Sequence, residues 1–456
     1  MRYRLLFADA QGVVYDHPRL LAAVRSGDTV RPPAAVDRAA SLPDGARLCL
    51  LPGRRPIGVD PATGEAVTLN EVKVGRRTFV PHAVGATLPP GWTRALLPAA
   101  ARPLLPTDEA PILPQWAYTA AALGGRGPVV FALHTDRRRH WSPATHSTPD
   151  LADRVEARLA RSENPIWRQI ARCALEWRCF TAQNTFYGRD EGAIPSSSAC
   201  NAACVGCLSE QEEGMPPSSH ERIARSPTAA EMAEVAAEHL ASARGRPMVS
   251  FGQGCEGEPL LRWREIARAI RLVRSRTRRG SIHLNSNGSL TRGLEALLDA
   301  GLDACRISLN SASPDLYAAY YRPVGYGVAD VVRSMKVAKE KGAYLALNLL
   351  TFPGVTDREE EAERLWRLVA RVRPHQVQTR SLAIDPDVYL ALARGRGGGG
   401  APIGMGALID GLRRASPGLV IGNFSRAKHE RPSPSRSGRA HRVVQNAGRQ
   451  PSGKRA

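Results

Sequence analysis

Residues 281–310, SIHLNSNGSLTRGLEALLDAGLDACRISLN, contain one complete strand–helix–strand unit. Alternating apolar and polar residues at 281–285 and 304–310 predict two strands, and the helical spacing of apolar residues at 291–300 predicts a helix between them. A connection of this kind joins parallel neighbours by a right-handed crossover, so the stretch predicts a parallel α/β sheet.

The same alternation continues on both sides of this unit, from residue 190 to about residue 395. Further strands are predicted at 248–252, 344–350 and 375–380, and further helices near 228–243, 260–278, 328–341 and 357–371. The repetition predicts a parallel sheet that is either doubly wound or closed toward a barrel.

Several predicted strands carry polar residues on one face. The residues on these faces are Ser281, His283, Asn285 and Asn287; Arg306, Ser308 and Asn310; Asn348; and Gln376, Gln378 and Arg380. Polar residues at strand ends would explain one or two such strands but not four. A doubly wound sheet is covered by helices on both faces and should be apolar on both. We therefore expect a curved, barrel-like sheet with helices outside and a solvated or ligand-filled interior.

The chain divides into regions of different composition. Residues 1–125, rich in Pro, Gly and short apolar runs, predict a smaller N-terminal β-rich domain; 126–189 a helical connector; 190–395 the core; 396–424 a short helical segment; and 425–456 a disordered basic tail. The tail is too polar to repay the entropy of ordering it.

The composition is that of a globular protein with an unusual charge. Of 456 residues, 43% are hydrophobic, and the net charge is +20. Such a charge suits RNA or DNA binding, but most basic residues are Arg, as a GC-rich coding sequence would produce. After residue 425, nine Lys or Arg residues face one Glu. A basic surface that contacts RNA therefore stays an alternative hypothesis.

The N-terminus has no apolar core of signal-peptide length, and no stretch is apolar enough to span a membrane. We expect a cytoplasmic protein without membrane contact. In a reducing cytoplasm, clustered cysteines bind metal more often than they form disulfides.

Three of the eight cysteines are crowded into residues 196–209, SSSACNAACVGCLS. Cys200, Cys204 and Cys207 can bind one metal centre together. Zinc would require a fourth ligand, and the nearest candidate is His220 in a loop. A 4Fe–4S cluster bound by three thiolates would keep one iron open for chemistry.

The segment CNAACVGC at 200–207 resembles the cluster motif of radical S-adenosylmethionine (radical SAM) enzymes. In that family, the amino and carboxylate groups of S-adenosyl-L-methionine bind the fourth iron. The resemblance implies a 4Fe–4S cluster on Cys200, Cys204 and Cys207, with S-adenosylmethionine as the second cofactor. The expected fold is α/β, a partial (β/α)6 TIM-like barrel.

Other segments resemble the family in the same order along the chain. GCEGEPLL at 254–261 is similar to the Gly-Gly-Glu-Pro element near the methionyl amine, and NSNG at 285–288 is similar to a Thr-Asn-Gly turn. SLNS at 308–311 is similar to a site for ribose or carboxylate, and LNLLTFPG at 347–354 is similar to an inner strand. The implied cofactor-binding residues are Gly257, Glu258, Pro259, Asn287, Ser308, Asn310 and Asn348. All follow or end predicted strands, at the edge where barrel folds build their sites.

Two positions depart from the family's pattern. Gly206 stands where an aromatic residue usually packs near adenine, so Val205 or Leu208 would have to supply apolar contact, and Glu256 replaces the first Gly of Gly-Gly-Glu-Pro. Cys255 is predicted to be a buried residue, with a hydrogen-atom donor or extra ligand as the alternatives. His283 and Arg380 are candidates to contact substrate, although satisfied interior residues are the commoner case.

The resemblance implies reductive cleavage of S-adenosylmethionine to a 5′-deoxyadenosyl radical that abstracts hydrogen from a small-molecule, peptide or RNA substrate. It also implies an electron donor such as flavodoxin or ferredoxin. No C-terminal cysteine cluster is present, which argues against the peptide-modifying branch with auxiliary clusters. The alternative is a non-radical zinc- or cluster-binding protein that contacts RNA through its basic surface.

Overall fold

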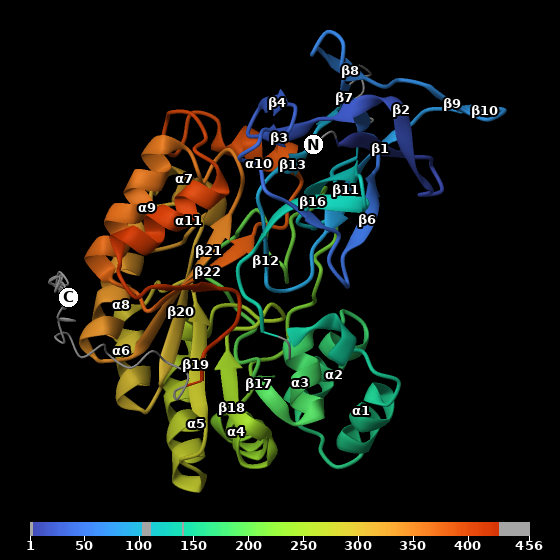
Figure 1. Ribbon diagram of the computed structural model, residues 1–456. Coiled ribbons are helices and arrows are strands. Elements are labelled where there is room, and N and C mark those ends of the chain that lie inside the picture. Colours follow the sequence, from blue (N-terminus) through green and yellow to red (C-terminus); the bar gives the residue numbers. More distant parts are fainter. Residues whose placement is uncertain (1–2, 103–110, 139–140, 428–456) are drawn as a thin grey trace, which may run out of the picture.

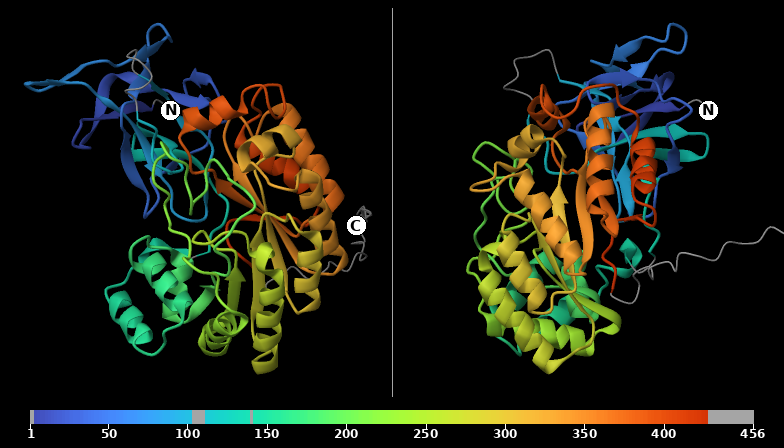
Figure 2. Two further views of the ribbon diagram at one scale, coloured as in Figure 1. Left: turned by 180° about the vertical axis from the view of Figure 1, so that it is seen from behind. Right: turned by 90° about the vertical axis from the view of Figure 1, so that its left-hand side faces the viewer.

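The computed structural model describes residues 3–102, 111–138 and 141–427. A parallel sheet with helices packed along it forms the core, a β-rich domain lies at one end of the sheet, and a group of three helices lies beside its first strands (Figures 1 and 2). No helix in these ranges combines the length and the apolar character needed to cross a membrane.

The core sheet contains seven parallel strands in sequence order. They are β17 (Arg189–Ala193), β18 (Arg244–Phe251), β19 (Ser281–Ser286), β20 (Ala304–Leu309), β21 (Tyr344–Thr351), β22 (Gln376–Ser381) and β23 (Val420–Gly422). The five predicted strands are confirmed. Each of the six strands β17–β22 is followed by at least one helix, and β23 adds a seventh strand at the edge, so an exact (β/α)6 barrel is not confirmed.

The two unpredicted strands have weak sequence signals. β17 reads RDEGA, with three charged residues and no apolar alternation, and β23 has only three residues. β23 pairs with β22 through Val377 and Ile421. The segment 396–424 is therefore more than a helix, since it returns the chain to the core sheet.

The helices between the strands agree with the predicted periodicity. They are α4 (Ala229–Ser242), α5 (Trp263–Arg276), α6 (Thr291–Asp299), α8 (Val328–Glu340) and α9 (Glu359–Val372), with α11 (Met405–Ala415) before β23. On β20, Cys305, Ile307 and Leu309 are buried in the core, while Arg306 and Ser308 on the other face are partly exposed. The predicted polar face is thus confirmed, and the apolar face packs against the helices.

Two short helices were absent from the predicted pattern. α7 (Pro314–Tyr321) follows β20, and α10 (Pro386–Ala393) follows β22. Both begin with Pro after Ser313 or Asp385, a recognised helix-start signal. At eight residues each they are too short for a clear periodicity.

The N-terminal domain is built on an eleven-stranded sheet whose pairings are antiparallel. Its strands include β1 (Arg4–Ala8), β2 (Val14–Ala22), β7 (Arg55–Val59), β11 (His82–Thr87), β15 (Thr119–Gly124) and β16 (Gly127–His134). The predicted boundary after residue 125 is wrong, because Gly125 and Arg126 are the loop of the β15–β16 hairpin. The helical connector begins later, with α1 (Leu151–Leu159), α2 (Pro165–Leu175) and α3 (Phe180–Tyr187).

The N-terminal domain is fastened to the end of β22. In β12 (Trp92–Arg94), the Thr93 and Thr379 hydroxyls lie 2.6 Å apart, and the Arg94 amide donates to Ser381 Oγ at 2.9 Å. The buried Arg94 guanidinium donates to the Leu382 carbonyl at 3.1 Å. These contacts hold the segment that follows β22 against the N-terminal domain.

The last described residues join the segment after β23 to β17, the strand at the opposite edge of the sheet. Ser425 is buried and donates to Glu191 at 2.7 Å, and Asp136 accepts the backbone N–H groups of Asn423 and Phe424 at 3.0 and 3.2 Å. The predicted start of disorder at 425 is therefore too early, because these polar groups find buried partners. Residues 428–456 of the predicted tail lie outside the described residues.

Candidate functional site

A cavity of about 490 Å³ lies at the carboxyl ends of the core strands, against the cysteine loop. Nine of the ten predicted site residues line it: Cys200, Cys204, Cys207, Gly257, Glu258, Pro259, Asn287, Ser308 and Asn348. All three cysteines are partly exposed. Segments far apart in the sequence thus meet at one cavity because parallel strands end at the same edge.

Asn310 does not line this cavity. Its side chain is buried and its Nδ2 donates to the Tyr389 hydroxyl at 3.2 Å. β20 ends at Leu309, so the alternation that would have placed Asn310 beside Ser308 stops one residue earlier. Ser308 itself accepts a hydrogen bond from Asn348 Nδ2 at 3.3 Å within the cavity wall.

Gly257 lies where the loop after β18 touches the cysteine loop. A Cβ atom at this position would stand 2.0 Å from the Ala199 carbonyl oxygen, so only glycine fits. The Gly257 amide donates to the Ser197 carbonyl and the Glu258 amide to the Ala199 carbonyl, each at 2.8 Å. These bonds fix the backbone immediately before Cys200.

The Glu258 carboxylate fastens the neighbouring loops. It accepts from the Leu260 amide at 2.9 Å, from Ser286 Oγ at 2.6 Å and from the Asn287 amide at 2.8 Å. Burial raises the pKa of Glu258 to about 7, against the opposite effect of these hydrogen bonds. The carboxylate therefore stabilises the turn after β19 through these hydrogen bonds.

Glu256 also joins two segments through hydrogen bonds to its carboxylate. One of its oxygens accepts from the Ser196 amide at 2.7 Å, from Ser196 Oγ at 2.6 Å and from the Ser197 amide at 3.1 Å. The other accepts from the Gly252 and Gln253 amides at 2.7 Å each. The departure from the Gly-Gly-Glu-Pro pattern is thus compensated, because Glu256 ties the start of the cysteine loop to the end of β18.

Glu256 predicts a pH dependence of stability. Burial raises its pKa from the ordinary value of 4.5 to about 7, although hydrogen bonds from Ser196 and the backbone lower it. Between these values the folded state binds more protons than the unfolded state, so the free energy of unfolding should fall as pH rises from about 4.5 to 7. In Glu256→Gln, the free energy of unfolding, measured with urea at several pH values in this range, should fall less steeply with pH than in the unaltered protein. An equal dependence on pH in both proteins would contradict a raised pKa of Glu256.

Tyr320 occupies the space that Gly206 leaves open. A Cβ atom at Gly206 would approach the Tyr320 hydroxyl to 2.9 Å, and Tyr320 is buried and lines the cavity. The carbonyls of Tyr320 and Tyr321, at the end of α7, accept the amides of Val205 and Ala203 at 3.0 and 3.1 Å. An aromatic ring therefore reaches the cysteine loop from α7 instead of from position 206.

Gly206→Ala is expected to lower the stability of the cysteine loop, because overpacking a buried contact typically costs about 1–3 kcal/mol. Tyr320→Phe in the same chain should recover part of the loss, since it removes the nearest atom, the hydroxyl. Urea unfolding of the single and double variants measures both effects. No recovery in the double variant would mean that Tyr320 does not fill this space.

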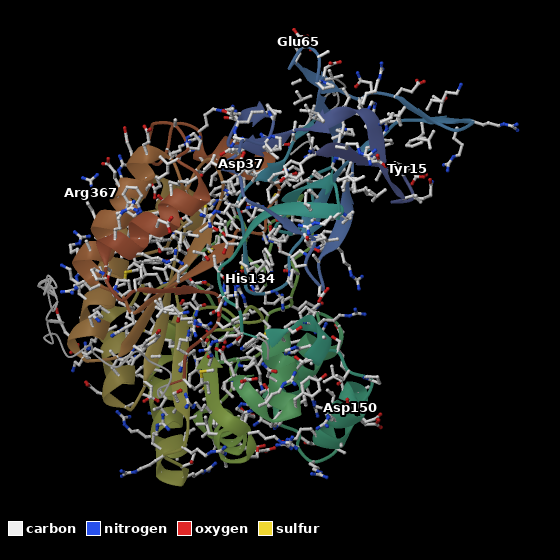
Figure 3. All side chains as sticks on the ribbon, in the orientation of Figure 1. Tyr15, Asp37, Glu65, His134, Asp150 and Arg367 are labelled. Atoms are coloured by element: carbon white, nitrogen blue, oxygen red, sulfur yellow. The ribbon has the colours of Figure 1, made fainter. Side chains whose placement is uncertain are left out.

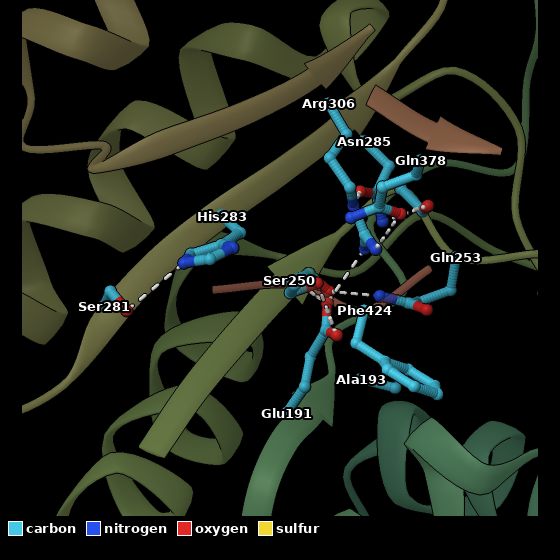
Figure 4. Close-up of polar contacts among 12 residues, drawn as sticks. Glu191, Ala193, Ser250, Gln253, Ser281, His283, Asn285, Arg306, Gln378 and Phe424 are labelled. Atoms are coloured by element: carbon cyan, nitrogen blue, oxygen red, sulfur yellow. Dashed lines mark hydrogen bonds and ion pairs between the residues drawn. The ribbon is translucent and has the colours of Figure 1, made fainter. Parts of the chain in front are cut away.

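A polar network extends from the cavity wall into the sheet (Figure 4). Glu191 on β17 accepts from Ser250 Oγ and, at 2.9 Å, from the Arg306 guanidinium. Arg306 also donates to Asn285 and, at 3.4 Å, to Gln378. Five strands, β17, β18, β19, β20 and β22, are thereby linked across the concave face.

The two candidates for substrate contact have different positions. Arg380 lines the cavity. His283 does not: its ring is buried and its Nε2 lies 3.2 Å from Ser281 Oγ, both on β19. His283 is thus an interior residue, the commoner case for such a position, and it lies two residues deeper along β19 than the cavity-lining Asn285.

Sequence reasoning missed part of the cavity wall. The additional residues include Thr181, Gln253, Tyr320, Tyr321, Leu350 and Leu382. The Ser-Pro-Asp start of α7 could have revealed the helix that carries both tyrosines. No local signal reveals Leu382, whose carbonyl accepts a hydrogen bond from Arg94 of the N-terminal domain.

The other cysteines lie apart from the cavity lining. Cys173, Cys255 and Cys305 are buried, and Cys49 and Cys179 are partly buried. Cys255 is 3% exposed, as expected for a core residue. Within residues 3–102, 111–138 and 141–427, no three His, Cys, Asp or Glu side chains are placed to hold a single metal ion.

The cysteine loop fits an iron–sulfur cluster by the chemistry of its donors. Three thiols face one cavity, and each would bind a different iron, so they need not converge on one point. The partners recorded for Cys207 Sγ are distant, Ser209 Oγ at 3.6 Å and the Arg222 guanidinium at 4.0 Å. Burial raises the pKa of the Cys200 thiol to about 11, so metal binding would have to drive its deprotonation.

Comparison with known proteins agrees with this chemistry. The family model described as the radical SAM superfamily matches residues 194–365; members of this family use a 4Fe–4S cluster and S-adenosylmethionine. No curated protein matches the sequence.

Three solved structures are similar at low identity. The structure described as native anSMEcpe with bound AdoMet is 16% identical, over 42% of this chain and 52% of that chain, with a TM-score of 0.33. A radical SAM methyltransferase from Sphaerobacter thermophilus is 17% identical, over 51% and 66%, with a TM-score of 0.37. Methylornithine synthase (PylB) is 16% identical, over 59% and 78%, with a TM-score of 0.36. The chain thus spans 52% and 66% of the first two structures.

These TM-scores are too low to indicate a family, so the family is indicated by the match to the family model alone. The matched segment carries the three cysteines and four of the core strands that end at the cavity, β18 to β21. Residues 194–365 of this chain thus form a segment that matches the radical SAM superfamily model.

Proposed function

We propose that this protein cleaves S-adenosylmethionine reductively and uses the resulting radical to abstract hydrogen from a substrate. The observation that carries the proposal is the meeting of Cys200, Cys204 and Cys207 with polar strand ends at one cavity. When bound, a reduced 4Fe–4S cluster supplies the electron that breaks a carbon–sulfur bond of S-adenosylmethionine and yields the 5′-deoxyadenosyl radical.

The chain's own residues hold the reactants and limit side reactions. The three cysteines would bind the cluster, and the Gly257–Pro259 turn would offer backbone groups to the methionyl end of the cofactor. Asn287, Ser308 and Asn348 line the cavity and would supply polar groups for ribose and adenine. The polar network around Glu191 and Arg306 and the N-terminal domain beside β22 would limit the access of water to the cavity. Exclusion of water protects a reactive radical from side reactions.

The substrate is proposed to be a small molecule, a peptide or an RNA, and the electron donor is proposed to be a protein such as flavodoxin or ferredoxin.

The (β/α)6 arrangement of the superfamily is proposed to correspond to β17–β22, with β23 as an additional strand at the edge. The protein is proposed to act in the cytoplasm.

Anaerobic reconstitution tests this function. With iron, sulfide, reductant and S-adenosylmethionine, the protein should become brown and should release 5′-deoxyadenosine and methionine in equal amounts, measured by liquid chromatography. Zinc in strictly anaerobic preparations without any cofactor cleavage would instead favour the zinc- or cluster-binding protein that contacts RNA.

A further inference from the structure

Two arginines line the cavity, and they differ in their partners. Arg306 on β20 pairs with the buried carboxylate of Glu191 at 2.9 Å. Among the described residues, Arg380 on β22 donates one hydrogen bond, to Gln378 Oε1 at 3.1 Å. Within the described part of the chain, no carboxylate lies within ion-pair distance of Arg380.

The two carboxylates that act electrostatically on Arg380, Glu191 and Asp136, already have other partners. Glu191 accepts from Ser250, Arg306 and Ser425. Asp136 accepts from Arg426 and from two backbone amides. Glu258, the one carboxylate among the described residues of the cavity lining, accepts from Leu260 in its own loop and from Ser286 and Asn287 at the end of β19.

An arginine without a counter-ion is costly to bury. Burial, followed by repulsion from Arg306, lowers the pKa of Arg380 to about 10, but the group stays charged at neutral pH. Its planar fork suits two parallel hydrogen bonds to a carboxylate or phosphate. The cavity thus holds a cation whose natural partner is an anion from outside the chain.

We propose that Arg380 binds an anionic group of the substrate, a carboxylate or a phosphate; this rests on the proposed radical function of the same cavity. The substrate class is thereby narrowed to molecules that carry such a group. Uncharged substrates would leave Arg380 unpaired.

S-adenosylmethionine also carries a carboxylate, but at its methionyl end. By the family resemblance, that end would bind beside the cysteines and the Gly257 turn after β18. Arg380 lies four strands further along the sheet, and neighbouring strands are about 4.8 Å apart. The position of Arg380 therefore favours the substrate over the cofactor as the source of the anion.

The N-terminal domain supports this position. The contacts of Thr93 with Thr379 and of Arg94 with Ser381 and Leu382 flank Arg380 on both sides. Arg380 is consequently presented by a fixed strand end, which lowers the entropy lost when an anion binds.

Titration of the reconstituted full-length protein with inorganic phosphate and with succinate tests the proposal. Isothermal calorimetry should show saturable binding of at least one anion, weakened about tenfold or more in Arg380→Met and partly retained in Arg380→Lys. Arg367→Met is the matched control, because Arg367 is exposed on the outer face of α9 (Figure 3). This control should bind the anion as the unaltered protein does.

Two further arms identify the source of the anion. Binding of the anion should persist with S-adenosylmethionine present. Displacement by S-adenosylmethionine but not by 5′-methylthioadenosine, which lacks the carboxylate, would assign Arg380 to the cofactor and overturn the proposal. Equal binding by Arg380→Met, or no saturable binding at all, would also overturn it. Failure of the radical function would be seen separately, as the absence of 5′-deoxyadenosine from the unaltered protein.

Discussion

Replacing Cys204 with Ala is expected to abolish both the iron–sulfur cluster and the release of 5′-deoxyadenosine. Cys204 is the middle cysteine of the loop, and its thiol faces the cavity with Cys200 and Cys207. Two remaining protein thiolates leave two irons of a cluster without protein ligands, and an enzyme without the cluster has no source for the electron. Iron content, visible absorption and chromatography of the products measure the loss.

Cys255→Ala is the matched control for this prediction. Cys255 follows β18 closely and is buried, but it does not line the cavity. Its replacement should reduce stability modestly while the cluster and the cleavage of S-adenosylmethionine persist. Loss of the cluster in Cys255→Ala, or full activity of Cys204→Ala, would contradict the assignment of ligands.

Glu191→Gln is expected to destabilise the fold by about 3–5 kcal/mol, because it removes one partner of a buried ion pair and leaves the Arg306 charge unpaired. Burial alone would raise the pKa of Glu191, but Arg306 and His283 hold it below its ordinary value, so the carboxylate is charged in the folded protein. Chemical denaturation at neutral pH measures the change in the free energy of unfolding.

The double variant Glu191→Gln with Arg306→Gln should be more stable than Glu191→Gln alone, since the unpaired cation is then absent. Glu363→Gln serves as the surface control. Its partner Arg367 is 72% exposed, and the exposed pair should contribute no more than about 1 kcal/mol. Equal losses from Glu191→Gln and Glu363→Gln would mean that burial of the Glu191–Arg306 pair has no energetic consequence.

The repeated strand and helix periods could be predicted because each depends on neighbouring residues only. β19, α6 and β20 follow directly from the spacing of apolar residues in 281–310. The hairpin loop at Gly125 and Arg126 was instead mistaken for a domain boundary, since glycine-rich segments mark both. β23 was missed because three residues are stabilised by pairing with β22 and not by their own pattern.

The sequence alone determined the three cysteines, the order of the strand-end motifs and the polar face of the sheet, because ligand type and side-chain alternation are local properties. Only the tertiary structure decided how the departures are accommodated. The Tyr320 ring reaches Gly206 from another helix, and Glu256 joins two loops through five hydrogen bonds. Which arginine keeps a free charge also depends on long-range contacts, since Glu191 and Arg306 lie 115 residues apart in the chain and meet only when the sheet curls.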